Sequence, residues 1–201
     1  MALLTYNGQP VIVERGAIVL RPGVSNRPAI ITAGRLRLFV QDGDGRQATV
    51  EYAGPGDAVG VAHYFDPDLP LTVQAISEAQ LLHFDGSVLE ELMGRDLKVA
   101  RAVAAMLADR VAAGAIQMRY HVFGSARLRL AAHLLMLAEP DATGRLVARV
   151  GQQELADAVG SVREHVARVL REFRRLRMVA TTRTSIVILD APALQAEAAL
   201  E

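Results

Sequence analysis

The stretch that decides the fold is QQELADAVGSVREHVARVLR, residues 152–171. It reads as two short helices on either side of Gly160. Two helices that cross at a steep angle need a small residue at the crossing and a tight turn between them, and Ala156 and Gly160 supply these. Four aliphatic residues are spaced so as to be buried between the helices, namely Leu155, Val159, Val166 and Val169. The stretch therefore predicts a helix-turn-helix.

The second helix carries its own start signal. Ser161 is followed three residues later by Glu164, which is the spacing of a capping box. Apolar residues at helical intervals then predict a buried face made of Val162, Val166, Val169, Leu170, Phe173 and Leu176. The opposite face carries Arg163, Glu164, Ala167, Arg168 and Arg171.

This outward face has the chemistry needed to read the DNA major groove. An Arg side chain can donate two hydrogen bonds to guanine, and a Glu can accept one from the amino group of cytosine. The alternative is an ordinary solvated face with ion pairs between residues four apart. We favour base reading because the charges occur together with the Gly160 turn, the capping box and a following hairpin.

The segments around this stretch complete a small domain. Residues 126–138 are expected to form an amphipathic helix, 139–144 a loop, 146–150 a strand, and the Thr-rich, β-branched residues 178–189 a hairpin. The Ala-rich stretch from 191 is expected to be a tail without evident chemistry.

Charge is distributed unevenly along the chain. The formal net charge is zero, but residues 123–190 contain eleven Arg against seven acidic residues, a balance of +4. Residues 1–122 carry eleven basic and thirteen acidic residues. The basic part therefore coincides with the predicted helix-turn-helix, as a nucleic-acid partner requires.

A long helix is predicted upstream, because from Ser87 the apolar period changes from two to about 3.5. One stripe follows three-four spacing and is suited to packing against a second copy of the helix. Its members are Leu97, Ala100, Ala104, Leu107, Val111, Gly114 and Met118. The alternative is that the stripe packs on the chain's own β domain. We favour a dimer seam because the helix is too long for one small barrel to cover.

The first part of the chain is predicted to be β structure. Short alternating segments occupy residues 17–20, 35–40, 48–52, 71–76 and 80–84, separated by turn residues rich in Gly, Pro and Asp. Many short strands at this spacing favour a small antiparallel barrel or jelly roll.

The composition excludes several classes of protein. The chain has no Cys, which removes disulfides, thiol nucleophiles and cysteine-held iron–sulfur clusters. No apolar run approaches the ~18 residues of a membrane span, and the first ten residues lack a signal-peptide pattern, so a cytoplasmic protein without membrane association is expected. We find no phosphate-cradling Gly loop or nucleophile elbow, so no enzymatic activity is expected.

Taken together, residues 11–190 resemble the Crp/Fnr family of transcription regulators, whose recognition helix carries an Arg-Glu pair and a second Arg five residues after the first. Here these are Arg163, Glu164 and Arg168. The resemblance implies an α+β fold with an antiparallel β-roll similar to a cyclic-nucleotide-binding domain, a long dimerisation helix and a winged helix-turn-helix. The corresponding boundaries are 1–92, 93–122 and 123–190, followed by the tail at 191–201.

The resemblance also implies roles for these residues. Arg163 and Arg168 would read guanines and Glu164 a cytosine, in an inverted repeat similar to TGTGA-N6-TCACA bound by a homodimer. Auxiliary contacts, mostly to the DNA backbone, are expected from Gln152, Gln153, Ser161, His165, Arg171 and Arg183. Transcription activation through RNA polymerase is expected rather than repression. The alternative is a β-roll sensor or interaction module for an unidentified ligand, with DNA binding non-specific or secondary.

The β-roll departs from cyclic-AMP-binding members of this family. Their Gly-Asp-x-x-Gly turn is present at residues 56–60, but Val61 stands where they carry Glu. Residues 66–71 read DPDLPL where they carry Arg-Ser for the phosphate. We therefore predict that cyclic AMP does not bind. His63 and His83 leave haem as a minor alternative, but the sequence favours no cofactor and no metal.

Overall fold

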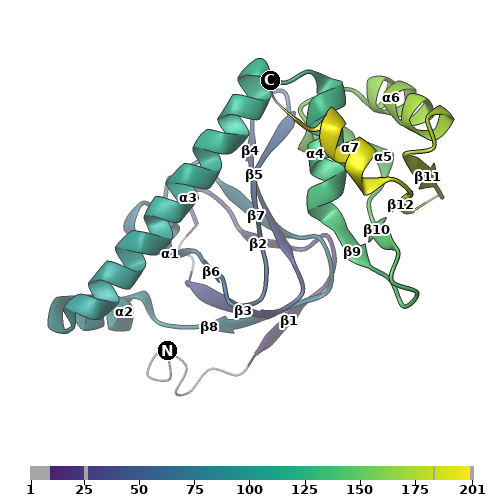
Figure 1. Ribbon diagram of the computed structural model, residues 1–201. Coiled ribbons are helices and arrows are strands. Elements are labelled where there is room, and N and C mark those ends of the chain that lie inside the picture. Colours follow the sequence, from purple (N-terminus) through teal and green to yellow (C-terminus); the bar gives the residue numbers. More distant parts are fainter. Residues whose placement is uncertain (1–9, 25–26, 183, 200–201) are drawn as a thin grey trace. The chain divides into compact units, whose positions relative to one another are not determined.

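The computed structural model describes residues 10–24, 27–182 and 184–199 (Figure 1). The chain divides into two compact units, one within residues 1–45 and 49–115 and the other within 46–48 and 116–201. The boundary falls inside a single helix, α3 (Leu97–Phe123). The predicted order of a β domain, a long helix and a helix-turn-helix domain is confirmed.

The first unit contains two four-stranded antiparallel sheets, with strand orders β1-β8-β3-β6 and β2-β7-β4-β5. The strands are β1 (Val11–Val13), β2 (Ile18–Leu20), β3 (Ala29–Ala33), β4 (Leu36–Gln41), β5 (Gln47–Ala53), β6 (Ala58–Val59), β7 (Thr72–Ala75) and β8 (Ala79–His83). Successive residues of a strand point to opposite faces, and the inward ones from both sheets form one core that includes Leu20, Ile31 and Val73.

The five predicted strands are all present, with ends that differ by one or two residues. Three strands of this unit, β1, β3 and β6, were not predicted. For β3 the reason is that Ala29–Ala33 is a nearly continuous apolar run without the alternation of a half-buried strand. Its first three residues are all buried, which explains why the alternation is missing.

The prediction of one long helix from Ser87 is wrong, because the segment forms α2 (Gly86–Arg95) and α3. Asp96 between them is extended, and its Oδ1 atom accepts a hydrogen bond from the Lys98 N–H at 2.8 Å. A short Asp side chain that bonds to nearby backbone competes with the helix in this way. Neither α3 nor any other helix in the described part of the chain is long and apolar enough to cross a membrane.

The second unit combines helices with one small sheet. After the end of α3 it contains α4 (Ala126–Leu137), β9 (Ala138–Pro140), β10 (Leu146–Ala148), α5 (Gln152–Ala158), α6 (Arg163–Arg175), β11 (Val179–Thr181), β12 (Ile186–Ile188) and α7 (Ala191–Glu197). The sheet has the order β11-β12-β10-β9, so the predicted hairpin is present as β11 and β12.

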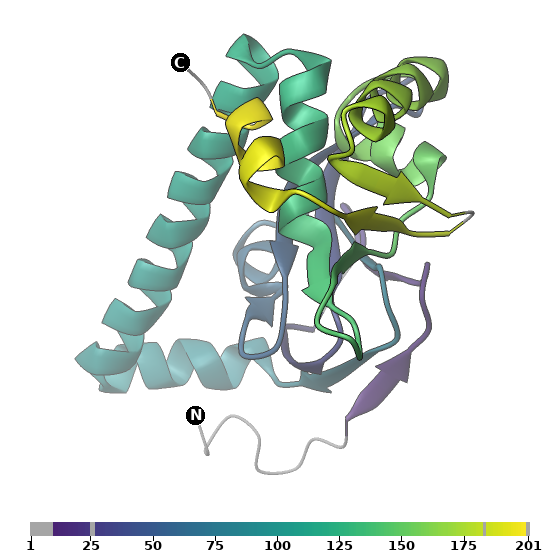
Figure 2. The same ribbon diagram turned by 45° about the vertical axis from the view of Figure 1, so that its right-hand side comes forward.

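The C-terminal helix α7 is part of this unit's core. It packs against α4, as Figures 1 and 2 show from two directions. Asp190 caps its start by accepting a hydrogen bond from the Ala193 N–H at 2.9 Å. Leu194 is fully buried in the same cluster as Leu130, Leu170 and Phe173.

Candidate DNA interface

The helix-turn-helix is closed by backbone hydrogen bonds around Gly160. This residue has φ +60°, in the left-handed region that favours glycine. The Ser161 N–H donates to the Ala156 carbonyl at 2.9 Å, which is the long hydrogen bond of a Schellman-type helix end. The predicted turn at Gly160 is thus confirmed in its backbone geometry.

The start of the second helix differs from the prediction. The N-cap of α6 is Val162, which makes no side-chain capping bond, so the predicted capping box of Ser161 and Glu164 is wrong. Because the Ser161 N–H closes the end of α5, this residue belongs to the turn and not to α6. Its Oγ atom instead lies 3.4 Å from Nδ1 of His165.

The buried face of α6 follows the prediction in its middle and not at its ends. The central residues Val166, Val169, Leu170 and Phe173 are buried against Leu155, Ala156 and Val159, all in one cluster. Val162 and Leu176, also predicted to be buried, are 63% and 47% exposed. They lie at the two ends of the helix, beyond the surface that α5 and α4 cover.

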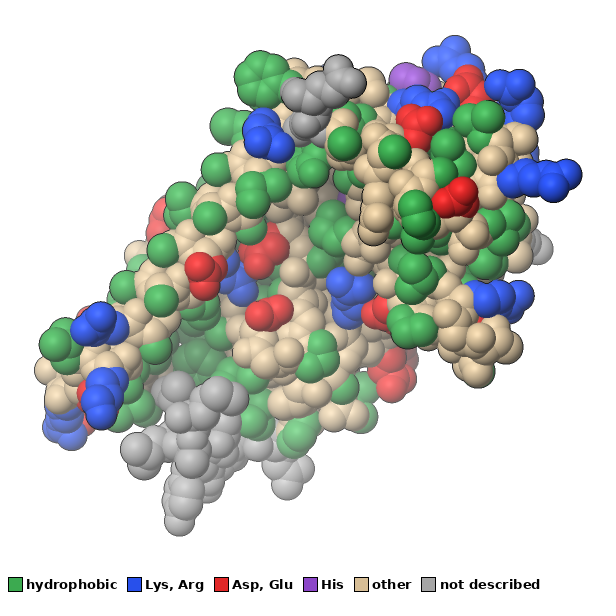
Figure 3. Space-filling view, in the orientation of Figure 1, with side chains coloured by type: hydrophobic (Ala, Val, Ile, Leu, Met, Phe, Trp, Pro, Cys, Tyr) green, Lys and Arg blue, Asp and Glu red, His purple; other side chains and the backbone are tan. Residues whose placement is uncertain are grey.

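The three residues predicted to read bases lie on the outer side of α6. Arg163, Glu164 and Arg168 are all exposed, and their side chains form no hydrogen bond or ion pair with any described residue. Glu164 and Arg168 are four residues apart, yet no salt bridge joins them, which is unlike the ion-paired solvated face considered as the alternative. Lys and Arg side chains gather around α6 in the surface view (Figure 3). The guanidinium and carboxylate groups are therefore available to an external partner.

The auxiliary residues lie around this face. Gln152, Gln153 and Arg171 are exposed, whereas Ser161 and His165 are half-buried. The Gln153 side chain donates a hydrogen bond to Asp157 Oδ1 at 2.8 Å. Arg183 lies outside the described residues.

The predicted seam on α3 divides into two sets. Leu97, Ala104, Val111 and Met118, spaced seven residues apart, are all exposed, with Leu97, Val111 and Met118 at 72%, 73% and 67%. Ala100, Leu107 and Gly114 are half-buried, and Leu107 packs against the core of the first unit. The neighbouring positions 101, 108, 115 and 122 are exposed instead of 100, 107 and 114. Together with Leu97, Ala104, Val111 and Met118 they form an exposed stripe with three-four spacing along the helix.

Comparison with known proteins gives the family. Residues 10–96 match the model of the cyclic nucleotide-binding domain, and residues 128–197 match that of the Crp-like helix-turn-helix domain. The transcriptional regulator LdrP of Thermus thermophilus is 32% identical over 160 residues, which cover 77% of this chain and 78% of LdrP. The chain belongs to the Crp/Fnr family of DNA-binding transcription regulators.

Other Crp/Fnr proteins match over nearly the whole length. A CRP-like cAMP-activated global transcriptional regulator of Mycobacterium tuberculosis is 28% identical over 202 residues, covering 96% of this chain and 90% of that protein. A solved CRP-family regulator, also from Thermus thermophilus, covers 94% of this chain and 96% of its own, with a TM-score of 0.81 and 26% identity. A Crp/Fnr structure from Eubacterium rectale has the same fold, with a TM-score of 0.84 at 22% identity and coverage of 98% and 92%. The chain is therefore a transcription regulator and not an enzyme.

The Gly-Asp-x-x-Gly turn at residues 56–60 is well formed, and the helix that follows it begins with an apolar residue. Asp57 Oδ2 accepts a hydrogen bond from the Gly54 N–H at 2.7 Å, and Gly60, with φ +82°, precedes α1 (Val61–Phe65). Val61 is 3% exposed and packs with Ile30 and Phe84 in an apolar cluster. An aliphatic side chain therefore occupies the first position of the helix that follows the turn.

The two histidines considered as haem ligands each have a backbone neighbour. His63 is buried, with Nε2 at 2.6 Å from the Leu71 carbonyl, and His83 Nδ1 lies 3.3 Å from the Arg27 carbonyl. Within the described ranges, no group of three or more His, Cys, Asp or Glu side chains could hold a metal ion.

Arg127, which was not among the predicted site residues, joins α4 to α6 and α7. Its Nη1 lies 2.6 Å from Glu172 on α6, and its Nε and Nη2 each lie 2.6 Å from the Glu197 carboxylate on α7. The guanidinium also lies 4.7 Å from the centre of the Phe173 ring. Hydrogen bonding from Arg127 lowers the pKa of Glu197. No local pattern links residues that are 70 positions apart, so only the folded chain reveals this contact.

Proposed function

We propose that the chain acts as a homodimer that binds an inverted-repeat operator in a sequence-specific manner. The observation that carries this proposal is the outer face of α6, where Arg163, Glu164 and Arg168 are exposed and have no partner among the described residues. Each side chain is free to form hydrogen bonds with base edges without first breaking an internal ion pair.

The proposed operator follows from the chemistry of these three residues and from the family. The two Arg side chains pair with guanine O6 and N7, and Glu164 accepts from a cytosine amino group. A half-site similar to TGTGA, repeated as TGTGA-N6-TCACA, satisfies these contacts. Phosphate contacts are proposed for Gln152, Gln153, Ser161, His165 and Arg171, which lie on α5, on α6 and in the turn between them. Such contacts position a protein on the duplex and do not select bases.

Pairing of two copies is proposed along the exposed stripe of α3. Apolar residues repeated every seven positions suit a helix that packs against its own copy, and Leu97, Val111 and Met118 are each more than two-thirds exposed. A two-fold axis then gives two recognition helices for successive major grooves, about 34 Å apart.

We propose that DNA binding does not require cyclic AMP. The phosphate of a cyclic nucleotide needs a positive charge nearby, but the segment after α1 contains Asp66 and Asp68, both exposed. The aliphatic side chain of Val61 cannot accept a hydrogen bond from the ribose. Activity would then follow the abundance of the protein in the cytoplasm, with activation of transcription through contacts to RNA polymerase as in the family.

The decisive experiment is selection of bound duplexes from random DNA by the purified chain with no small molecule added. We expect enrichment of an inverted repeat with guanines and a cytosine in each half-site. The selected duplex should keep its advantage over a scrambled duplex at both low and high salt, because base contacts are less salt-sensitive than phosphate contacts.

Two results would contradict the proposal. Equal affinity for the selected and scrambled duplexes at both salt concentrations would identify a purely electrostatic binder, as expected for an interaction module whose DNA binding is secondary. Enrichment that appears only after cyclic AMP is added would refute the claim of independence from the nucleotide.

A further inference from the structure

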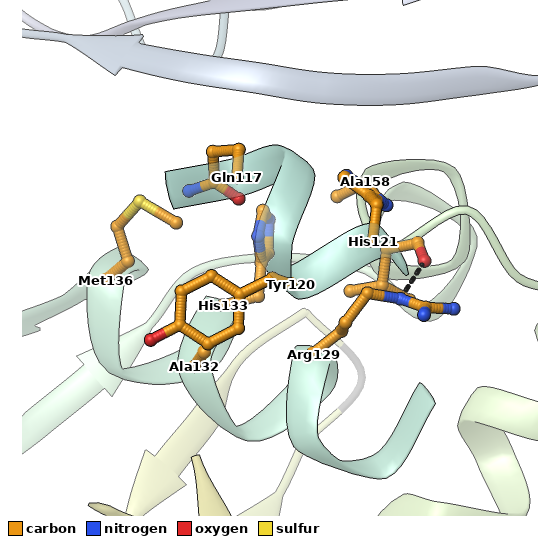
Figure 4. Close-up of a pocket in the computed structure, with 9 residues that line it drawn as sticks. Gln117, Tyr120, His121, Arg129, Ala132, His133, Met136 and Ala158 are labelled. Carbon is orange, nitrogen blue, oxygen red and sulfur yellow. Dashed lines mark hydrogen bonds between the residues drawn. The ribbon is translucent and has the colours of Figure 1, made fainter. Parts of the chain in front are cut away.

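A cavity of about 210 Å³ lies in the second unit behind the helix-turn-helix (Figure 4). Side chains from three helices surround it: Gln117, Tyr120 and His121 from α3, Arg129, Ala132, His133 and Met136 from α4, and Ala158 with the following Val159 from α5. At about 30 Å³ per molecule in the liquid, this space corresponds to roughly seven waters. It is therefore large enough for a small organic molecule.

Arg129 is the charged group of this cavity. Its Nε donates to the Val159 carbonyl at 2.9 Å, and its Nη1 donates to the Gly124 carbonyl at 2.7 Å. Both carbonyls lie at or just beyond the end of a helix, where helical partners are missing. No carboxylate forms an ion pair with Arg129 in the described part of the chain. Burial accordingly lowers the pKa of Arg129, and its hydrogen-bond partners among the described residues are the two carbonyl groups.

The rest of the lining determines what could bind there. A guanidinium has five N–H donors, of which the two carbonyls occupy two. None of the lining residues is acidic, and Tyr120 and Gln117 add further donors. His121 and His133 are also polar, and the apolar part of the lining is made of Ala132, Met136, Ala158 and Val159. A half-buried cation that has no anionic partner among the described residues, next to apolar side chains, suits a negatively charged group attached to a small apolar body.

We propose that this cavity is a binding site for a small organic carboxylate, held by the Arg129 guanidinium with its apolar part against Ala132 and Met136. The carboxylate supplies the anion that Arg129 lacks. The site shares no residue with the outer face of α6.

The test uses the full chain labelled with ¹³C at the methionine methyl groups, with the Met136 signal assigned from a Met136→Leu variant. The probes are sodium benzoate, its neutral counterpart benzamide, and inorganic phosphate. We expect benzoate to shift the Met136 signal in a saturable manner. Benzamide should bind at least about tenfold more weakly than benzoate, because it is neutral and charged hydrogen bonds are roughly twice as strong as neutral ones. Phosphate is charged but lacks an apolar body, and it should also bind at least about tenfold more weakly.

Three variants locate the binding. Arg129→Gln removes the cation, and Ala132→Leu fills the cavity while keeping Arg129 and its two carbonyl bonds, so it remains informative if Arg129→Gln does not fold. Both should abolish the saturable shift. Arg119→Gln is the matched control, because Arg119 is exposed on α3 and does not line the cavity. It should leave the benzoate affinity unchanged.

The proposal is overturned if benzoate gives no saturable shift of the Met136 signal. It is also overturned if benzamide or phosphate binds with the same affinity as benzoate, or if the shift is unchanged in Ala132→Leu. The measurement uses the protein without DNA, so its outcome is independent of whether the operator is recognised as proposed above.

Discussion

Replacing Arg168 by Ala should remove base recognition without affecting folding. The side chain is exposed and forms no hydrogen bond or ion pair with any described residue, so the free energy of unfolding should change by no more than about 0.5 kcal/mol. Loss of a bidentate contact to guanine costs about 1–3 kcal/mol. A symmetric dimer loses two such contacts, which gives about 2–6 kcal/mol and raises Kd by about 30-fold or more.

Fluorescence anisotropy with the selected operator measures this change. Duplexes in which one base pair is replaced symmetrically in both half-sites should identify a single position at which Arg168→Ala no longer discriminates. Arg175→Ala is the matched control, because Arg175 is exposed in the last turn of the same helix. It should weaken binding to all duplexes by a similar factor, or not at all.

Base reading by Arg168 is excluded if Arg168→Ala weakens binding by one common factor on every duplex. Arg168 would then contact phosphates and not bases. A thermal unfolding curve that shifts as strongly as the affinity would also refute it, since the side chain would then have a structural role.

Four further outcomes are expected. Val111→Asp places a charge in the exposed stripe of α3, and should convert dimers to monomers in sedimentation at a concentration where the unaltered chain is dimeric. Arg127 lowers the pKa of Glu197 in the folded state below the unfolded value near 4.5. The contact therefore stabilises the folded state at a pH above 4.5 or so, and this stabilisation is lost as the pH falls through the pKa of Glu197 in the folded state. In Glu197→Gln the free energy of unfolding, measured by denaturant titration, should therefore depend less steeply on pH below pH 5 or so. An unchanged pH dependence would contradict this. Gly160→Val forces a β-branched residue to φ +60°, and should destabilise the second unit by about 1–2 kcal/mol or more in hydrogen exchange. Leu194→Ala should destabilise the same unit by about 2–5 kcal/mol, since the side chain is fully buried; a change below 1 kcal/mol or so would show that the site collapses around the smaller residue.

The fold could be predicted wherever the sequence contains a period or a turn signal. The change from alternation to a helical period, followed by the turn at Gly160, predicted the order of the domains. The spacing of the apolar residues after Gly160 predicted that Arg163, Glu164 and Arg168 face outward. The capping box could not be predicted correctly, because the same Ser161 can either start α6 or close α5. Local spacing contains no information about which of the two backbone arrangements is the more stable.

Features that depend on distant residues were not predictable. Arg127 and Arg129 are two residues apart on α4, yet one pairs with carboxylates on α6 and α7 while the other bonds only to carbonyls. Their sequence contexts are almost the same. What distinguishes them is the surface that the rest of the unit brings against each side of α4.

The burial of Leu194 affects how a separate DNA-reading fragment should be made. A fragment that ends at Asp190 would lack α7 and with it Leu194, which belongs to the same buried cluster as Leu130 and Phe173. Part of that cluster would then be exposed to solvent. One that begins at Phe123 would lose Tyr120, whose carbonyl accepts the Gly124 N–H at 3.0 Å. A fragment of residues 116–199 retains both α7 and Tyr120. It lacks most of the apolar stripe through which two copies are proposed to pair. Such a fragment would allow the affinity for a single half-site to be measured apart from the contribution of pairing.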